Sequence, residues 1–274
     1  MPIIAGYYTA ANDMAKIAKV LGKKADQHTY TALAAQLADE FTTRFRHQDT
    51  TGVYYGSDSE TSNAMALDAG LVPADDQPQV LARLVASVRT AGNHITSGSV
   101  GLGPLFRALQ AGGRDDVIYD MAVNPTSPGY GYLVNNGYTT LPESLDGSGS
   151  QNHHFLGQID SWLIKGLAGI GQSAGSVAYR NLDISPAVVG DLTHASGSYD
   201  TPQGTVTSAW HKDSRGRLTL KVTIPAGSTA TVHVPATAGT RVRAGGSTTP
   251  TPLDRTATTA SYRVGAGDFT FQAG

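Results

Sequence analysis

The sequence lacks cysteine altogether, which excludes thiolate catalysis, disulfide bonds and cysteine-ligated zinc. Charged residues make up only 15% of the chain, and 20 Lys+Arg nearly balance 22 Asp+Glu, without basic blocks. Such a chain is poorly suited to gripping a phosphate backbone, so we expect no nucleic-acid partner. No apolar run approaches the roughly 18 residues of a membrane span, and Met1–Ile4 does not open a signal peptide. We therefore expect a soluble chain with neither a signal peptide nor a membrane partner, of unknown localisation.

Glutamate and metal-binding patterns are scarce as well. Only three of the acidic residues are glutamates, namely Glu40, Glu60 and Glu143. The histidines show no HxxxH or HxH spacing, and the adjacent His153 and His154 would diverge on a helix. The sequence also places no strand before the glycines at 101–103, as a dinucleotide-binding loop would require. We therefore predict no metal site and no cofactor.

The first two thirds of the chain show helical periodicity. Apolar side chains recur every fourth residue from Leu33 to Phe45, which predicts a helix over residues 27–46. Similar patterns predict helices over residues 12–21, 61–71, 77–91, 101–111, 115–122 and 156–170. Long loops separate some of them, above all at residues 125–152, and long loops in compact domains are often functional.

The last third alternates with period two, which is typical of half-buried strands. Residues 218–224 and 230–234 alternate on either side of a Pro-Ala-Gly-Ser turn, so we expect them to form a hairpin. Further strands are expected at 262–264 and 269–271, with a loop at 245–252. The sequence thus predicts two domains, a helical one over residues 1–180 and an antiparallel β-sandwich over residues 181–274.

Chemically active side chains are densest in the loop at residues 137–154. It holds Glu143 and, just before the next predicted helix, Asn152 and His153. A carboxylate, an amide and an imidazole can together activate water and hold sugar hydroxyls. Pro142 restricts the preceding residue to extended geometry and so stiffens the approach to Glu143. An equally weighted alternative is that Asn152 caps the helix, while His153 and Glu143 are merely solvated.

These residues resemble a known family. The run Gly-Tyr-Thr-Thr-Leu-Pro-Glu that ends at Glu143, the Asn152–His153 pair and the segment after Gly157 resemble the C-terminal half of the α-L-rhamnosidases of glycoside hydrolase family 78. Other segments agree in the same order. They are GLVP at 70–73, GNHITSG at 92–98, PGYGY at 128–132 and TPQG at 201–204.

The resemblance implies an (α/α)6 catalytic barrel and hydrolysis with inversion. It implies that Glu143 is the general base and that His153 contacts the sugar of a rhamnose-containing glycoside or polysaccharide. Inverting hydrolysis needs two carboxyl groups about 6.5–9.5 Å apart. The family's general acid lies upstream of the segment that matches this chain. We therefore expect a partial barrel, which a missing N-terminal segment or a second chain completes by covering the exposed apolar faces of the first helices.

Two further residues are candidates for substrate binding. Glu60 stands at the entry to a predicted helix, where the helix dipole would lower its pKa, so we favour sugar binding or capping over proton donation. Tyr130 is expected either to stack on a pyranose ring or to pack against a helix. The family usually has Trp at Tyr130 and at Pro142, so another deoxy sugar or a uronic acid stays open as substrate. A noncatalytic carbohydrate-binding or assembly module also stays open.

Overall fold

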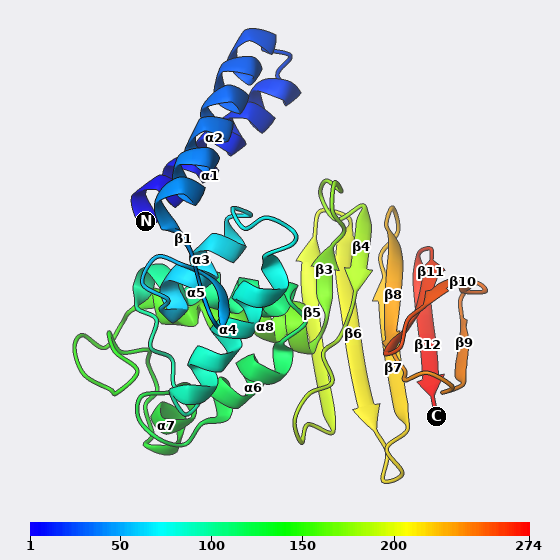
Figure 1. Ribbon diagram of the computed structural model, residues 1–274. Coiled ribbons are helices and arrows are strands. Elements are labelled where there is room, and N and C mark those ends of the chain that lie inside the picture. Colours follow the sequence, from blue (N-terminus) through cyan, green and yellow to red (C-terminus); the bar gives the residue numbers. More distant parts are fainter. The chain divides into compact units, whose positions relative to one another are not determined.

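The computed structural model describes all residues from 1 to 274, and their contacts divide the chain into two compact units (Figure 1). The first unit, Met1–Gln158, is helical except for one short hairpin. The second unit, Ile159–Gly274, consists mainly of β-strands. No helix has the length and apolar character that a membrane span requires.

The first unit confirms most of the predicted helices. The helix predicted at 12–21 is part of a longer helix that begins at Pro2, a residue that the first turn of a helix tolerates. The hairpin and the short helix that begins at Tyr130 had no clear signal in the sequence. The elements are α1 (Pro2–Val20), α2 (Lys24–Phe45), β1 (Arg46–Asp49), β2 (Gly52–Tyr55), α3 (Glu60–Asp68), α4 (Gln77–Thr90), α5 (Ser99–Ala111), α6 (Asp115–Val123), α7 (Tyr130–Asn135) and the 3-10 helix η1 (His154–Gln158).

Helices α1 and α2 form a long antiparallel pair, which Figure 1 shows in blue. Its base is anchored where Phe41 of α2 stacks on Tyr55 of β2, with ring centroids 5.7 Å apart and both side chains fully buried. The opposite side of α1 stays open. Apolar side chains at helical spacing remain exposed there, including Ile3, Tyr7, Met14 and Ile17. An amphipathic helix with such a stripe lacks the neighbour that would bury it.

The N-terminal ends of α3 and α5 lie close together. A capping box starts α3: Ser62 N donates to Ser59 Oγ (3.2 Å), and Ser59 N donates to Ser62 Oγ (3.0 Å). Gly101 of α5 lets the helices approach closely, because a Cβ at this position would come within 2.4 Å of Thr61 Oγ1. This packing places Glu60, the first residue of α3, near the loop that enters α5.

The second unit starts with two short helical turns and continues as ten strands. The strands form two five-stranded sheets, in the orders β10-β11-β8-β4-β3 and β5-β6-β7-β12-β9. Their inward side chains share one core, which includes Trp210, Phe269 and Phe271. The elements are α8 (Ile159–Trp162), the π-helix η2 (Leu163–Leu167), β3 (Ile170–Gln172), β4 (Asn181–Ile184), β5 (His194–Thr201), β6 (Gly204–Lys212), β7 (Leu218–Ile224), β8 (Thr229–Pro235), β9 (Val242–Gly246), β10 (Thr251–Arg255), β11 (Thr259–Val264) and β12 (Gly267–Ala273).

Residues 154–167 are helical, which confirms most of the helix predicted over residues 156–170, but they do not form one regular α-helix. The segment is instead divided into η1, α8 and η2, and Gly169 ends it with a φ of +73°. Only glycine fits there, because a Cβ would lie 2.2 Å from Pro186 N. Trp210 Nε1 donates a hydrogen bond to the Leu167 carbonyl at 2.8 Å, which satisfies one of the last helical carbonyls.

The hairpin predicted between residues 218–224 and 230–234 is also wrong, although both strands exist. Strand β7 pairs with β6 and β12, whereas β8 pairs with β11 and, in parallel, with β4. The turn after Ile224 therefore passes from one sheet to the other, and the sheets are not wholly antiparallel. Period-two alternation shows which side chains face the core but not which strand is the neighbour. Strands β9 and β10 likewise occupy both ends of the loop predicted at 245–252.

Candidate active site

Glu143 lies on the loop between α7 and η1, and this loop folds back on itself. Glu143 N donates to the Ser150 carbonyl at 2.7 Å, and Ser144 N donates to the Ser148 carbonyl at 3.2 Å. Gly149 has a φ of +80° and lies directly against the glutamate. A Cβ on Gly149 would come within 2.6 Å of Glu143 Cβ and 2.7 Å of its Oε2. Glycine at 149 is thus required for the observed position of the carboxylate.

Ser150 links Glu143 to His153. The Ser150 amide donates to Glu143 Oε2 at 3.3 Å, and the Ser150 hydroxyl shares a hydrogen bond with His153 Nδ1 at 2.6 Å. The backbone of His153 is held in turn, because its amide donates to the Leu141 carbonyl at 2.8 Å. One serine therefore orients a carboxylate and an imidazole at the same time, and leaves Glu143 Oε1 open to solvent and ligand.

Glu143 and His153 line one cavity of about 640 Å³. This volume lies in the range of small-molecule pockets. The facing wall is the loop that enters α5, from Ile95 to Ser99, and the lining contains Phe155 but no Tyr or Trp. A polar loop with a free carboxylate oxygen thus faces a second polar loop across a space that a sugar could fill.

Glu60 lies behind that second loop. The residue is 1% exposed, and its Oε2 accepts hydrogen bonds from Thr96 N (3.1 Å) and Ser97 Oγ (3.4 Å). Its Oε1 is buried without a partner. Burial raises the pKa of Glu60 and outweighs these hydrogen bonds, so the lowered pKa predicted from the helix terminus is wrong. The predicted capping role is also wrong, because Ser59 caps α3.

The structure does not bring Asn152 and Tyr130 into the lining of this cavity. Asn152 is exposed and does not form part of the lining. Tyr130 is 8% exposed and its hydroxyl donates to the Leu156 carbonyl at 2.5 Å, so its ring packs behind the wall. Among the predicted site residues, the cavity therefore unites Glu143 and His153, with Glu60 behind the opposite wall.

Sequence reasoning missed Ser150, Gly149 and the bracing of Thr96 by Glu60. The Gly-Ser run at 147–150 indicates only a loop, and nothing in it shows that residue 150 returns to residue 143. The chain also contains a Gly-x-Ser-x-Gly run at 171–175. Ser173 lies between β3 and β4, which pair antiparallel, so the run is not the strand-to-helix elbow of a serine hydrolase.

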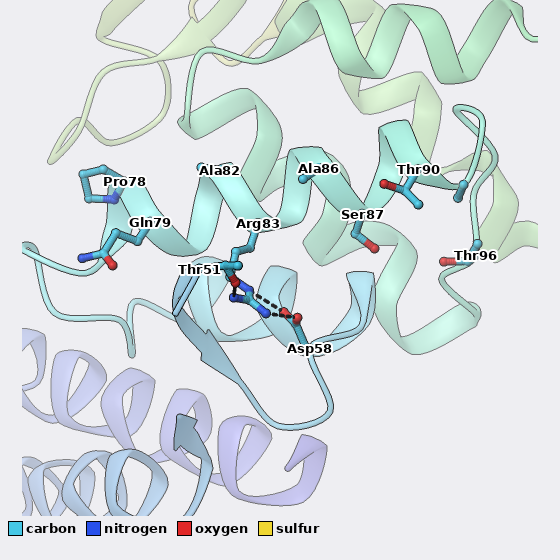
Figure 2. Close-up of a pocket in the computed structure, with 11 residues that line it drawn as sticks. Thr51, Asp58, Pro78, Gln79, Ala82, Arg83, Ala86, Ser87, Thr90 and Thr96 are labelled. Carbon is cyan, nitrogen blue, oxygen red and sulfur yellow. Dashed lines mark hydrogen bonds and ion pairs between the residues drawn. The ribbon is translucent and has the colours of Figure 1, made fainter. Parts of the chain in front are cut away.

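A larger cavity of about 940 Å³ runs along α4 (Figure 2). Figure 2 shows Arg83 directed at Thr51 and Asp58. Arg83 Nη1 also donates to Asp49 Oδ1 at 2.8 Å, and the guanidinium lies 4.6 Å from the ring centroid of Tyr54. Its hydrogen bonds lower the pKa of both carboxyl groups. Asp49 of β1 and Asp58 of the loop before α3 are both paired with Arg83, which thereby connects the β1–β2 hairpin to this loop. Neither carboxylate is free for acid–base chemistry.

Comparison with known proteins finds a matching family model for each of the two parts of the chain. The family model described as the bacterial alpha-L-rhamnosidase 6 hairpin glycosidase domain matches residues 4–167. The model of the bacterial alpha-L-rhamnosidase C-terminal domain matches residues 169–249. A curated relative, an alpha-L-rhamnosidase of Formosa agariphila, is 30% identical over 81% of this chain. The chain spans about a quarter of the length of the curated relatives it matches, 24% of this one.

Two solved structures are also similar. The alpha-L-rhamnosidase of Streptomyces avermitilis complexed with L-rhamnose matches 98% of this chain and 26% of its own, with a TM-score of 0.89 and 28% identity. The alpha-L-rhamnosidase of Dictyoglumus thermophilum matches 97% of this chain and 31% of its own, with a TM-score of 0.85 and 29% identity. Both likenesses extend over the helical and the β part.

Proposed function

Since this chain belongs to the bacterial α-L-rhamnosidase family, we propose that it forms part of an inverting glycoside hydrolase that removes terminal α-L-rhamnosyl residues. The substrate in this proposal is a rhamnose-containing glycoside or polysaccharide. The observation that carries it is the shared cavity of Glu143 and His153, oriented by Ser150.

In the proposed reaction Glu143 is the general base. Its carboxylate takes a proton from a water molecule as the water oxygen attacks the anomeric carbon, while a protonated carboxyl group on the other face donates its proton to the departing glycosidic oxygen. His153 holds a sugar hydroxyl. The only other carboxyl group lining the cavity, Asp146, accepts a hydrogen bond from Ser148 N at 2.8 Å in the same loop as Glu143. We therefore place the general acid in a segment upstream of residue 1.

The helical unit is proposed to be part of an (α/α)6 barrel. The exposed stripe on α1 supports this, because a further helix of the barrel would bury Ile3, Tyr7 and Ile17. An upstream segment or a second chain would supply that helix. The domains assigned from the sequence, 1–180 and 181–274, stay a prediction, and the two contact units divide the chain earlier, between Gln158 and Ile159.

Release of the phenol from an aryl α-L-rhamnoside tests the proposal. The chain alone should give little turnover, because protonation of the leaving group lacks its acid. The chain extended upstream by its native sequence should turn over the same substrate. Robust turnover by the chain alone would show that the general acid does not lie upstream of residue 1. Failure of both proteins to release the phenol would contradict the proposed rhamnosidase activity.

A noncatalytic carbohydrate-binding module is the second candidate. It is favoured because the hydrogen bond from Ser148 lowers the pKa of Asp146, the only other carboxyl group in the lining, and a binding site needs no proton donor. Titration calorimetry with L-rhamnose, followed by the hydrolysis assay on the extended protein, discriminates between the two. Rhamnose binding without hydrolysis by the extended protein would support the binding module.

Another deoxy sugar or a uronic acid is the remaining alternative. Tyr130 and Pro142, which stand where the family usually has Trp, are both buried, so neither offers a free ring face to a sugar. Competition of the rhamnose titration by L-fucose and by D-glucuronate measures this preference. If L-fucose or D-glucuronate binds more tightly than L-rhamnose, that sugar becomes the proposed substrate in place of rhamnose.

A further inference from the structure

Positive charge gathers at one end of the second unit. Of the ten Lys and Arg residues that follow residue 158, half lie on or beside the β6–β7 connection and the start of β9. Among the side chains that line the cavities at this end, only that of Asp213 is acidic, and the last residue, Gly274, lines both cavities. The five cations, which we call the basic cluster, are Lys212, Arg215, Arg217, Arg241 and Arg243.

Most of the basic cluster has no acidic partner. Arg217 is the exception, because its Nε donates to Asp213 Oδ2 at 2.7 Å. No ion pair joins an acidic group to Lys212, Arg215, Arg241 or Arg243. Like charges that lie close together repel one another, so a bound anion would reduce the repulsion among these cations.

The β-sheet sets the geometry of the cluster. Arg243 pairs with Gln272 of β12, which pairs on its other side with Thr219 of β7, so these three lie in one row across three strands. Arg241 lies just before β9, and its carbonyl accepts a hydrogen bond from Gly274 N at 3.1 Å, which extends the pairing of β9 with β12. Residues two apart in extended backbone point to the same face, and Arg241 and Arg243 line the same cavity.

Two cavities adjoin at the cluster. One of about 270 Å³ is lined by Arg217, Arg241, Arg243 and Gln272. The other, of about 500 Å³, shares Arg217 with it and also touches Lys212 and Arg215. Four apolar residues, Val188, Leu218, Pro235 and Ala236, also line the second cavity. Because the two linings share residues, we treat the two cavities as one groove and call these four residues its floor.

We propose that this groove binds an acidic oligosaccharide, through carboxylate or sulfate groups on its sugars. Guanidinium groups bind both anions with paired hydrogen bonds, while Gln272 and Thr219 can reach hydroxyls. The apolar floor suits the C–H faces of sugar rings. Neither lining contains Phe, Tyr or Trp, so the groove lacks the stacking platform of single-stranded nucleic-acid sites. This site is independent of the cavity at Glu143.

Titration calorimetry on the whole chain tests the proposal, with three hexasaccharides as probes. Hexagalacturonate carries carboxylates, a sulfated hexasaccharide carries sulfates, and maltohexaose is neutral. We expect binding of at least one acidic probe, weakening as salt screens the charges, and no binding of maltohexaose. Whichever acidic probe binds tighter identifies the natural substituent.

The double variant Arg241→Gln/Arg243→Gln should weaken that binding about tenfold, as expected for two exposed charged contacts. The matched control is Arg180→Gln/Arg263→Gln, which removes the same charge from exposed positions beside and within the other sheet. It should change the affinity less than about twofold. Urea unfolding followed by tryptophan fluorescence verifies that both variants stay folded.

Several results would overturn the proposal. They are failure of both acidic probes to bind, equal binding of maltohexaose, equal loss in the two double variants, or tighter binding of a single-stranded DNA of matched charge. Failure of L-rhamnose to bind the same chain would instead count against the site at Glu143 and leave this groove unaffected.

Discussion

Replacing Glu60 should separate its hydrogen bond from its charge. Glu60→Gln retains an oxygen that can accept from Thr96 N, and it removes a buried negative charge. Glu60→Ala removes the acceptor and leaves the Thr96 amide unpaired, which costs about 1–3 kcal/mol. With a urea slope of about 1–3 kcal/mol per molar, the alanine variant should unfold at a urea concentration lower by about 1 M than the glutamine variant.

The charge of Glu60 adds a pH dependence of known sign. Burial raises its pKa in the folded protein, so the folded state binds this proton more tightly than the unfolded state does. Its ionisation therefore destabilises the first unit as pH rises from the ordinary carboxyl pKa through the raised one. Glu60→Gln should remove that loss and be the more stable protein at pH 7.

Both tryptophans, Trp162 and Trp210, lie in the second unit, which gives the assay an internal control. Circular dichroism at 222 nm follows the helices of the first unit, while tryptophan fluorescence follows the second. The fluorescence transition should not move in either variant. Equal stability of the two variants by circular dichroism would refute the reasoning, since it would mean that the contact with Thr96 contributes nothing.

Three further outcomes follow from the same contacts. Gly149→Ala should displace Glu143 and cost about 1 kcal/mol or more from its positive φ, with turnover of the upstream-extended protein falling further than its stability; unchanged turnover would contradict the close approach. Arg83→Met should lower the urea midpoint of the helical signal alone, because it unties the β1–β2 hairpin; an unchanged midpoint would show that the ion pairs are not needed. Asp183 raises the pKa of His233, so this pair stabilises the second unit below about pH 6.5, and the stabilisation is lost as pH rises through the raised pKa. His233→Gln should therefore make the urea midpoint of the fluorescence signal less dependent on pH. An unchanged pH dependence of this midpoint would argue against the role of the pair.

Local sequence patterns predicted the helices and strands well, but they did not predict which strands pair with each other. The four-residue repeat from Leu33 to Phe45 is sufficient for a helix, and alternation from Leu218 to Ile224 is sufficient for a strand. The crossing between sheets after Ile224 depends on contacts with strands far along the chain, which no local pattern contains. The helix predicted over residues 156–170 ends at Leu167, because Gly169 requires a left-handed turn.

In the candidate site, too, contacts within one loop could be predicted, whereas contacts between residues distant in the sequence could not. Glu143 and His153 could be predicted as neighbours because they share one loop and carry complementary chemistry. The burial of Glu60 could not, because it depends on a contact with Thr96, 36 residues away. The role of Ser150 depends on how the loop folds back, and serine in a Gly-Ser run gives no signal of that.

Turnover of an aryl α-L-rhamnoside by the upstream-extended protein, with and without Glu143→Gln, tests the central claim most directly. We expect Glu143→Gln to lower kcat by about 10²–10⁴-fold, the usual contribution of a general base, with unchanged urea unfolding. Glu40→Gln is the matched control, because Glu40 pairs with Arg44 on the surface of α2 and should leave kcat unchanged. Proton NMR of the first product should show the β-anomer of rhamnose from the wild type. Near-normal turnover by Glu143→Gln, or the α-anomer as first product, would contradict the account.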